Sequence, residues 1–287
     1  NSGGVTSVSA LAAATPLTQR DLDFPGAPAK YYPRADVYGR NFARLTADDT
    51  RIAKLALESL GRRGVRSIYA IDSGDTDGVA FSSALSRFAA ASGLRFAGRK
   101  SVVGDQADWP SVVEEARVSG ADAIAWGSAA GLGEQELWRA VRTSGSRQLM
   151  VAGPAVPQDV LASLPAVKGS TRSFSGLVPS AESQSGMAGF VERFRKQTGR
   201  PPLPGAANAS AAMDLLLDAI GAGSRTAGPS QTGDDLRAAT AKALHSIRAV
   251  RTDFGRVELT PVGNALDAPV VEWVVTPGSI KPFGTLR

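Results

Sequence analysis

Short apolar segments alternate with amphipathic segments from residue 46 to residue 178, and this alternation restricts the fold more than any other feature of the chain. Each apolar segment is short enough for a buried strand, and each amphipathic segment has apolar residues at helical spacing. Strands joined by helical crossovers form a parallel, doubly wound sheet, so we predict an α/β fold. The expected strands are 65–71, 96–103, 121–126, 148–152 and 173–178, and the expected helices include 79–92, 134–144 and 158–164.

Local signals for helix starts support this order of elements. Thr46 and Asp49 form a capping-box-like pattern ahead of an apolar helical face, which Gly61 ends. Asp108 precedes a segment with Pro110 in its first turn, where proline is favoured. We therefore predict further helices that begin near residues 46 and 108.

The pattern changes after residue 178, where helical segments predominate and strands return only near the end. Residues 21–38 are rich in Pro, Gly and Tyr, lack a period, and are predicted to form a loop. A turn at Gly263-Asn264 is predicted to join the last two strands. The helices predicted here are 183–198, 206–222 and 234–247, and the last two strands are 255–260 and 270–276.

The composition is that of a globular protein, with 43% hydrophobic and 21% charged residues. No apolar stretch approaches the length that spans a bilayer. The net charge is +5, but the basic residues are scattered, and the 6% of aromatic residues do not interleave with them. We therefore expect no nucleic-acid partner. The densest basic groups, at 62–66 and 193–196, lie near the polar ends of predicted helices, where cations suit the helix dipole.

The chain offers little for catalysis or metal binding. It has no cysteine, which excludes disulfides, thiolate metal sites and a cysteine nucleophile. Its single histidine, His245, leaves no histidine-based metal cluster, and a surface or capping role is expected for it. No G-x-S-x-G motif occurs to complete a catalytic triad. We predict no catalytic residue, no metal and no cofactor.

Two loops partly match enzyme motifs. Asp75-Thr76-Asp77-Gly78 is similar to the D-x-D-G of haloacid-dehalogenase-like phosphatases, but the predicted strand ends at Ile71 instead of directly before the first Asp. Residues 127–133 lie between a strand and a helix, as a dinucleotide loop would, without the G-x-G-x-x-G spacing. An Asp-dependent phosphohydrolase is kept only as a second alternative function.

Several segments, taken in order, resemble the branched-chain amino acid (Leu/Ile/Val) receptor family of type I periplasmic binding proteins. Residues 7–18 resemble its loop of small and hydroxyl residues before a Leu-Thr, and residues 42–49 resemble its F-R-x-x-x-x-D. Residues 105–127 resemble its D-F … G-A-D-x-I-x-x-x-G, and residues 253–263 its G-x-x-x-F-x-x-x-G. Their order and spacing over nearly the whole chain carry the resemblance.

The resemblance implies two lobes with doubly wound parallel sheets that close on a ligand by a hinge. Lobe I would comprise 1–44 and 179–254, and lobe II 45–178 and 255–287. Because the small-residue loop comes so early here, roughly the first quarter of the usual chain has no counterpart, and lobe I is expected to lack its N-terminal strands. Missing strands expose apolar edges, so we expect a homodimer, a partner segment that completes lobe I, or a rearranged lobe I.

The resemblance also implies that lobe I hydroxyls and amides hold a ligand carboxylate, while acidic and tyrosine residues of lobe II hold an ammonium. Ser9, Ala10 and Thr15 match the first group, although Ala13 competes with Thr15 for the hydroxyl position.

The lobe II group is altered. Asp77 stands where tyrosine is common, Ala155 stands where amino-acid binders carry glutamate, and residues 127–131 lack aromatic side chains. An ammonium without a buried acidic partner loses ~1.5–3 kcal/mol. Asp77 either replaces that partner or caps the helix beginning at Gly78, and we favour the cap. Trp126 lines the cleft or belongs to the core. The predicted ligand contacts are Ser9, Ala10, Thr15, Asp77, Trp126, Ser128, Ala130 and Ala155.

The sequence therefore predicts a non-enzymatic receptor that closes on a small organic solute and presents it to the membrane permease of an ABC importer. The ligand would be amino-acid-like, or a small carboxylate or amide. Residues 1–4 show no signal peptide, and the organisation favours a chain that begins after a processed or removed segment, placing the protein outside the cytoplasm, anchored through a segment not present in this chain. The alternative is a degenerate sensor or protein-interaction domain without a transport ligand.

Overall fold

In a computed structural model the chain forms two compact units, each of which is described separately. The structure describes residues 3–103, 107–128, 133–156, 158–178, 186–227 and 232–286. Unit 1 comprises Asn1–Asp48 and Gly176–Pro269, and unit 2 comprises Asp49–Ser175 and Val270–Arg287. The chain therefore passes from one unit to the other three times. The third passage comes at residue 269, later than the predicted boundary at residue 254.

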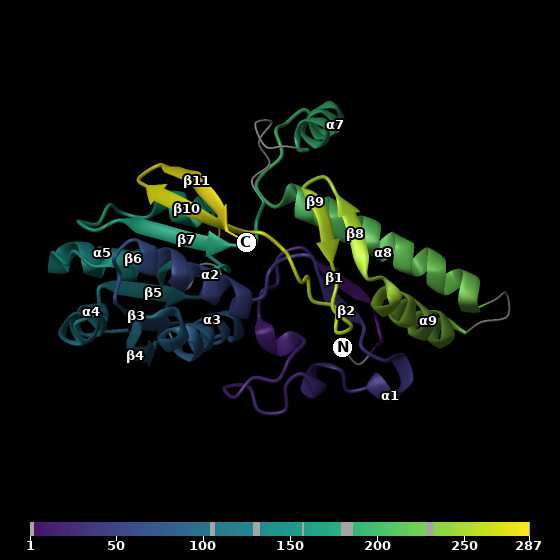
Figure 1. Ribbon diagram of the computed structural model, residues 1–287, viewed down its shortest axis with the longest axis horizontal. Helices are drawn as coiled ribbons and strands as arrows, with labels where there is room; N and C mark the ends of the chain where they lie inside the picture. The colour runs from purple at the N-terminus through teal and green to yellow at the C-terminus, as the bar shows by residue number, and fades with distance from the viewer. Residues whose placement is uncertain are drawn as a thin grey trace. The chain divides into compact units, whose positions relative to one another are not determined.

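Unit 2 is built on a seven-stranded sheet in the order β11-β10-β7-β6-β5-β3-β4 (Figure 1). The strands from β3 to β7 pair in parallel, whereas β10 pairs antiparallel with both β7 and β11. This arrangement confirms the predicted parallel α/β sheet. The strands are β3 (Ser67–Asp72), β4 (Arg95–Ser101), β5 (Ala123–Gly127), β6 (Leu149–Ala152), β7 (Thr171–Ser175), β10 (Val270–Thr276) and β11 (Ser279–Leu286).

Helices of unit 2 cover both faces of its sheet. Alternate strand residues such as Ile71 and Trp126 enter a core cluster with side chains of α4, α5 and α6, while α2 and α3 pack together against other parts of the sheet. Residues of α3 such as Phe81 are fully buried, as the amphipathic pattern predicts. The helices are α2 (Asp49–Arg62), α3 (Thr76–Phe88), α4 (Trp109–Val118), α5 (Glu134–Ser144) and α6 (Gln158–Ser163), with a 3-10 turn at Ala90–Ser92.

Unit 1 holds two separate two-stranded pairs and several helices. Strand β1 (Ser7–Ser9) pairs in parallel with β2 (Phe42–Arg44), and β8 (Ala249–Thr252) forms an antiparallel hairpin with β9 (Gly255–Glu258). The long helix α8 contacts α9, β1 and β8. The helices are α1 (Ala35–Tyr38), α7 (Ala188–Thr198), α8 (Ala206–Ala227) and α9 (Gly233–Ser246), with 3-10 turns at Thr15–Leu17 and Ala29–Tyr31. Within the predicted loop 21–38, the structure therefore has two short helical turns.

The prediction that a turn at Gly263-Asn264 joins strands 255–260 and 270–276 is wrong, because these two strands belong to different units. Strand β9 pairs with β8, and this hairpin keeps residues 255–269 in unit 1. The turn at Gly263-Asn264 does form, because Thr260 and Asn264 exchange hydrogen bonds, but it folds the chain back onto β2. Gly263 has φ +83°, and its carbonyl oxygen accepts a 2.8 Å hydrogen bond from the Arg44 amide. A Cβ there would lie 2.5 Å from the Phe42 carbonyl oxygen, so the close approach requires glycine.

Candidate functional site

The loops that follow β3, β5 and β6 lie at one edge of the unit 2 sheet, because the carboxyl ends of parallel strands share an edge. Three predicted contacts lie on these loops: half-buried Asp77 after β3, buried Ser128 after β5, and half-buried Ala155 after β6. Ala130 lies outside the described residues. The sheet edge therefore brings together the unit 2 positions that the sequence predicted separately.

A buried ion pair sets the shape of the loop after β3. Asp72 is fully buried at the end of that strand, and its carboxylate accepts a 2.7 Å bond from Arg99 Nε on β4 and a 3.0 Å bond from the Gly74 amide. The Arg99 guanidinium also donates to the Ser83 hydroxyl on α3 at 3.2 Å. Such a paired buried charge fixes a loop because breaking the pair leaves the other charge desolvated.

Helix α3 is capped by Asp75, and the expected cap at Asp77 is wrong. The Asp75 carboxylate accepts a 2.9 Å bond from the Gly78 amide, and its other oxygen pairs with the Ser73 hydroxyl. The helix begins at Thr76, two residues earlier than Gly78, so Asp77 lies in its first turn. There its negative charge suits the helix dipole, and its side chain remains partly exposed at the sheet edge.

Two glycines allow α3 to start directly against the end of β5. A Cβ on Gly78 would lie 2.5 Å from the Gly127 carbonyl oxygen, and a Cβ on Gly127 would lie 2.7 Å from the Gly78 carbonyl oxygen. The Ser73 amide also donates to the Gly127 oxygen at 3.1 Å. Close backbone contacts therefore bring the β3 and β5 loops together at this edge.

Trp126 belongs to the core. Its side chain is fully buried in the unit 2 core cluster, where its ring meets Trp109 edge to face with centroids 5.7 Å apart. Its indole nitrogen has no hydrogen-bond partner among the described residues. Of the two interpretations left open by the sequence, the structure favours the core.

In unit 1 the loop after β1 carries the other predicted contacts. The Ser9 hydroxyl oxygen accepts bonds from the amides of Leu11 (3.2 Å) and Ala12 (2.9 Å), which turns the chain directly after the strand. Ala10 is half-buried in this turn, while Thr15 is buried at the start of the 3-10 turn that follows. The three residues lie on one loop, and Thr15 is the least exposed of them.

A fully buried arginine underlies this loop, and sequence reasoning missed its role. Arg44 on β2 donates from Nη1 to the Ala12 carbonyl, and from Nη2 to the Ala14 carbonyl and the Thr18 hydroxyl, each at 3.0 Å. These three bonds fix the guanidinium beneath the loop. The only signal in the sequence was the position of Arg44 in the segment that resembles F-R-x-x-x-x-D.

Tyr32 also makes a hydrogen bond to the same loop. Its buried hydroxyl donates to the Leu17 carbonyl at 2.6 Å. Burial raises the pKa of Tyr32, while the nearby Arg40 and Arg44 partly oppose that change. Residues 9–18, which we call the small-residue loop, are therefore held in one shape by hydrogen bonds from β2 and from Tyr32.

The described residues offer no catalytic constellation. No group of three or more His, Cys, Asp or Glu side chains in the described ranges could hold a metal ion. His245 lies far along unit 1 on α9, next to Gly263, and burial lowers its pKa. Among the helices that the structure describes, none has the length and apolar character needed to cross a membrane.

Comparison with known proteins identifies the family to which this chain is similar. A model of the family described as periplasmic binding protein matches residues 2–271. No curated protein matches the chain.

Several solved structures share the fold. An ABC transporter substrate-binding protein from Desulfitobacterium hafniense in complex with Leu has TM-score 0.71 and 20% identity, covering 98% of this chain and 74% of its own. A solute-binding protein from R. palustris in complex with benzoate has TM-score 0.70 and 14% identity, covering 99% and 71%. An extracellular ligand-binding receptor from Rhodopseudomonas palustris HaA2 has TM-score 0.73 and 15% identity, covering 98% and 76%. The fold is that of the type I periplasmic binding proteins.

Proposed function

This chain belongs to the periplasmic binding protein family, and on that premise we propose that it is a non-enzymatic receptor for a small organic carboxylate. The observation that carries the proposal is the small-residue loop, which Arg44 and Tyr32 hold in one shape. A preformed loop of small residues that carries hydroxyl groups and backbone amides favours an anionic group, because both kinds of group can donate hydrogen bonds to it. The Ser9 hydroxyl and the Thr15 hydroxyl are the side chains that we assign to it.

The unit 2 edge supports a ligand without an ammonium group. Position 155 is alanine, so it supplies no carboxylate for an amino group. Of the acidic side chains at this edge, Asp72 pairs with Arg99, Asp75 caps α3, and Asp77 lies in the first turn of α3. The solved relatives bind both kinds of ligand, Leu in one structure and benzoate in another. We assign this protein to the second kind.

The ligand class can be tested with two matched analogues of leucine and with benzoate. 4-Methylpentanoate keeps the side chain and carboxylate of leucine without its amine, and isopentylamine keeps the amine without the carboxylate. The acid and benzoate should raise the melting temperature, and the amine should not. A ligand at 100 times its Kd adds about 2.7 kcal/mol of stability, which is easily measured.

Two variants examine the assigned residues. Ser9→Ala and Thr15→Val should each weaken binding of the carboxylate about tenfold, because each removes a hydroxyl hydrogen bond to an anion. Ser224→Ala, an exposed position on α8, is the matched control and should leave affinity unchanged. If leucine and isopentylamine bind while the acids do not, and Asp77→Asn abolishes that binding, the ligand is an amine held by Asp77.

The same proposal includes the setting of the receptor. We propose that it acts outside the cytoplasm and delivers its solute to the permease of an ABC importer. Co-purification with a permease encoded beside it would support this, and stimulation of transport by the loaded receptor would establish it. A chain that binds none of these solutes, or other small carboxylates and amides, would fit a degenerate sensor instead.

Association of two copies, or with a segment that completes unit 1, is part of the proposal. Apolar side chains such as Leu11 and Leu217 are exposed in unit 1. Sedimentation of the purified chain measures this directly, because a dimer has twice the monomer mass.

A further inference from the structure

Helix α7 and the β8–β9 hairpin form one subassembly of unit 1. Phe254, in the turn of the hairpin, packs against the apolar side of α7 formed by Phe190 and Val191. The Arg193 guanidinium donates to the Asp253 carboxylate at 2.8 Å. Figure 1 shows α7 beyond the turn that joins the two strands. We call residues 186–200 and 248–258 together the basic ridge.

Most of the excess positive charge of the chain lies on this ridge. It contains seven basic and three acidic residues, whereas the whole chain has 32 and 27, which leaves 25 and 24 elsewhere. All seven basic residues are exposed. They are Arg193, Arg195, Lys196, Arg200, Arg248, Arg251 and Arg256. The remainder of the protein is therefore almost neutral, and the ridge dominates its long-range attraction for anions.

The hairpin places two cations directly opposite one another. Arg251 pairs with Arg256 across the strands, on the face opposite the buried pair Val250 and Val257. Like charges in directly opposed positions destabilise a hairpin. The helix dipole suits the cations of α7, but it does not explain why Arg251 and Arg256 stand opposite one another. Glu258 lies 3.3 Å from Arg256 and balances only one of the two. An external anionic surface removes this repulsion.

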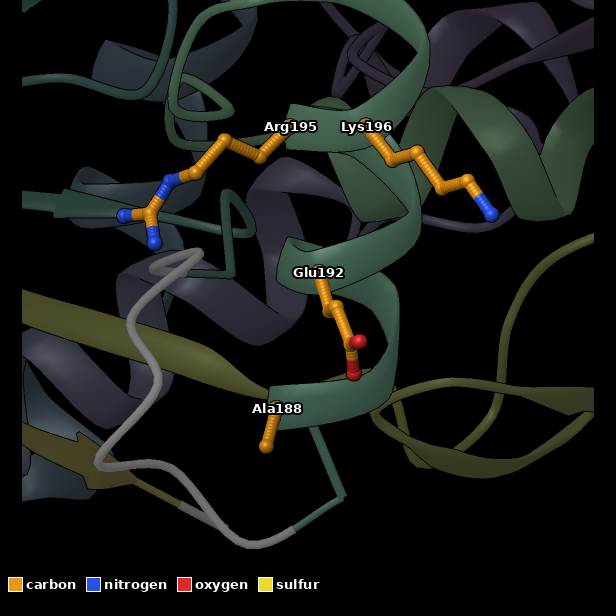
Figure 2. Close-up of a pocket in the computed structure, with 4 residues that line it drawn as sticks. All are labelled: Ala188, Glu192, Arg195 and Lys196. Carbon is orange, nitrogen blue, oxygen red and sulfur yellow. The ribbon is translucent and has the colours of Figure 1, made fainter.

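The ridge does not form a site for a single anion. An open recess of about 500 Å³ on α7 is lined by Ala188, Glu192, Arg195 and Lys196. Figure 2 shows the Arg195 and Lys196 side chains leaving the helix in different directions, and Glu192 adds a negative charge to the same wall. Diverging cations on an exposed helix and hairpin match a spread-out array of negative charges, such as lipid headgroups, better than one phosphate or carboxylate.

We propose that the basic ridge docks unit 1 onto the surface of an anionic phospholipid bilayer. Attraction at such a surface depends on the number of basic residues close to it and falls off within a Debye length. The ridge would hold the protein near the membrane reversibly. It does not include the small-residue loop, residues 9–18. This inference does not depend on the ligand proposed above.

Vesicle sedimentation tests the proposal. The protein should bind vesicles of phosphatidylglycerol and phosphatidylcholine in 50 mM salt, and should be released in 500 mM salt or when the vesicles are pure phosphatidylcholine. The fourfold variant Arg195→Gln, Lys196→Gln, Arg251→Gln, Arg256→Gln should lower the partition coefficient at least ~100-fold, since each basic residue near the surface contributes roughly fivefold.

A second fourfold variant is the matched control. Arg62→Gln, Arg142→Gln, Arg147→Gln and Lys168→Gln remove the same charge from exposed positions of unit 2, and should change the partition coefficient less than ~5-fold. Unchanged melting temperatures establish that both variants are folded. An equal loss in both variants, or no binding of the unmodified protein to anionic vesicles, overturns the proposal. Binding to poly-glutamate without binding to vesicles overturns it in favour of an acidic polypeptide partner.

Discussion

In unit 2 a seven-stranded sheet is covered by helices on both faces, whereas the described part of unit 1 holds two separate two-stranded pairs between helices. Three of the thirteen large apolar side chains exposed in the described residues belong to unit 2, and ten belong to unit 1. Two-stranded pairs are marginal on their own, so unit 1 depends on other contacts. The buried polar network around Arg44 supplies some of them. The comparison indicates that packing on both faces of one large sheet holds unit 2, whereas unit 1, whose strand pairs are small, also depends on contacts such as those of Arg44.

Removing a core side chain of unit 2 should give the largest difference in stability between the two units. Trp126→Ala should destabilise unit 2 by about 3–5 kcal/mol, because it leaves a large cavity in a dry core. Denaturant unfolding followed by circular dichroism should then show an earlier transition for unit 2 and an unchanged one for unit 1. Trp126→Phe keeps part of the packing and should cost less than half as much. If Trp126→Ala leaves stability intact and abolishes ligand binding, Trp126 lines the site instead.

Removing the buried guanidinium should act on unit 1 alone. Arg44→Met should cost about 3 kcal/mol or more, because the Ala12 and Ala14 carbonyls and the Thr18 hydroxyl lose their donor. The same denaturant experiment measures the shift in the unit 1 transition. Arg62→Met, an exposed arginine at the end of α2, is the control and should change stability by less than about 0.5 kcal/mol. Equal effects of the two substitutions would contradict our view of unit 1.

The two acidic residues at the start of α3, Asp75 and Asp77, should contribute differently to the stability of unit 2. Asp75→Ala removes the cap and should cost about 1 kcal/mol of unit 2 stability, while Asp77→Ala loses only a favourable position near the helix dipole, about 0.3–1 kcal/mol. Thermal unfolding of the two variants measures the difference. If Asp77→Ala lowered stability more than Asp75→Ala, Asp77 would be the residue that caps the helix.

The smallest expected effect is a pH dependence confined to unit 1. Burial lowers the pKa of His245 below 6.5, and Arg40 and Arg248, the charged groups that face it, act in the same direction. A depressed histidine pKa means that the unfolded chain binds the proton more tightly. Stability from this group is therefore present above pH 6.5 and declines as the pH falls toward the folded pKa.

Unfolding of unit 1 between pH 7.5 and pH 5.5 measures this dependence, and the slope cannot exceed about 1.4 kcal/mol per pH unit for one group. His245→Gln should flatten the profile of unit 1 and leave that of unit 2 unchanged. An identical profile in the variant would assign the pH dependence to other groups.

The sequence predicted unit 2 better than unit 1, for physical reasons. Strands such as 121–126 are continuous apolar runs between glycines and polar residues, so the local sequence is enough to predict that they are buried. Strand β11 was missed, because Ser279–Leu286 contains Pro282 and Lys281 and is largely exposed at a sheet edge. The partner of β9 was also missed, because β8 has only four residues, and their burial gives too little pattern to reveal a strand.

The candidate site divides in the same way. Positions on the sheet edge of unit 2 followed from strand order, but which aspartate caps α3 was decided by a shift of two residues in the helix start. The role of Arg44 was hidden because an arginine is expected on the surface, and a three-residue strand gives too little pattern to reveal its burial. The assignment of Ser9, Ala10, Thr15, Asp77, Ser128, Ala130 and Ala155 to ligand contacts stays a prediction.

The contact between Gly78 and Gly127 has a consequence for how such a receptor changes its ligand. Because the two backbones touch, part of what positions the β3 and β5 loops does not depend on their side chains. The contact between Gly78 and Gly127 would therefore survive substitutions at neighbouring positions such as 77, while a side chain at either glycine would break it. A single frame of this kind can serve chemically different solutes in succession, with its ligand preference rewritten one side chain at a time.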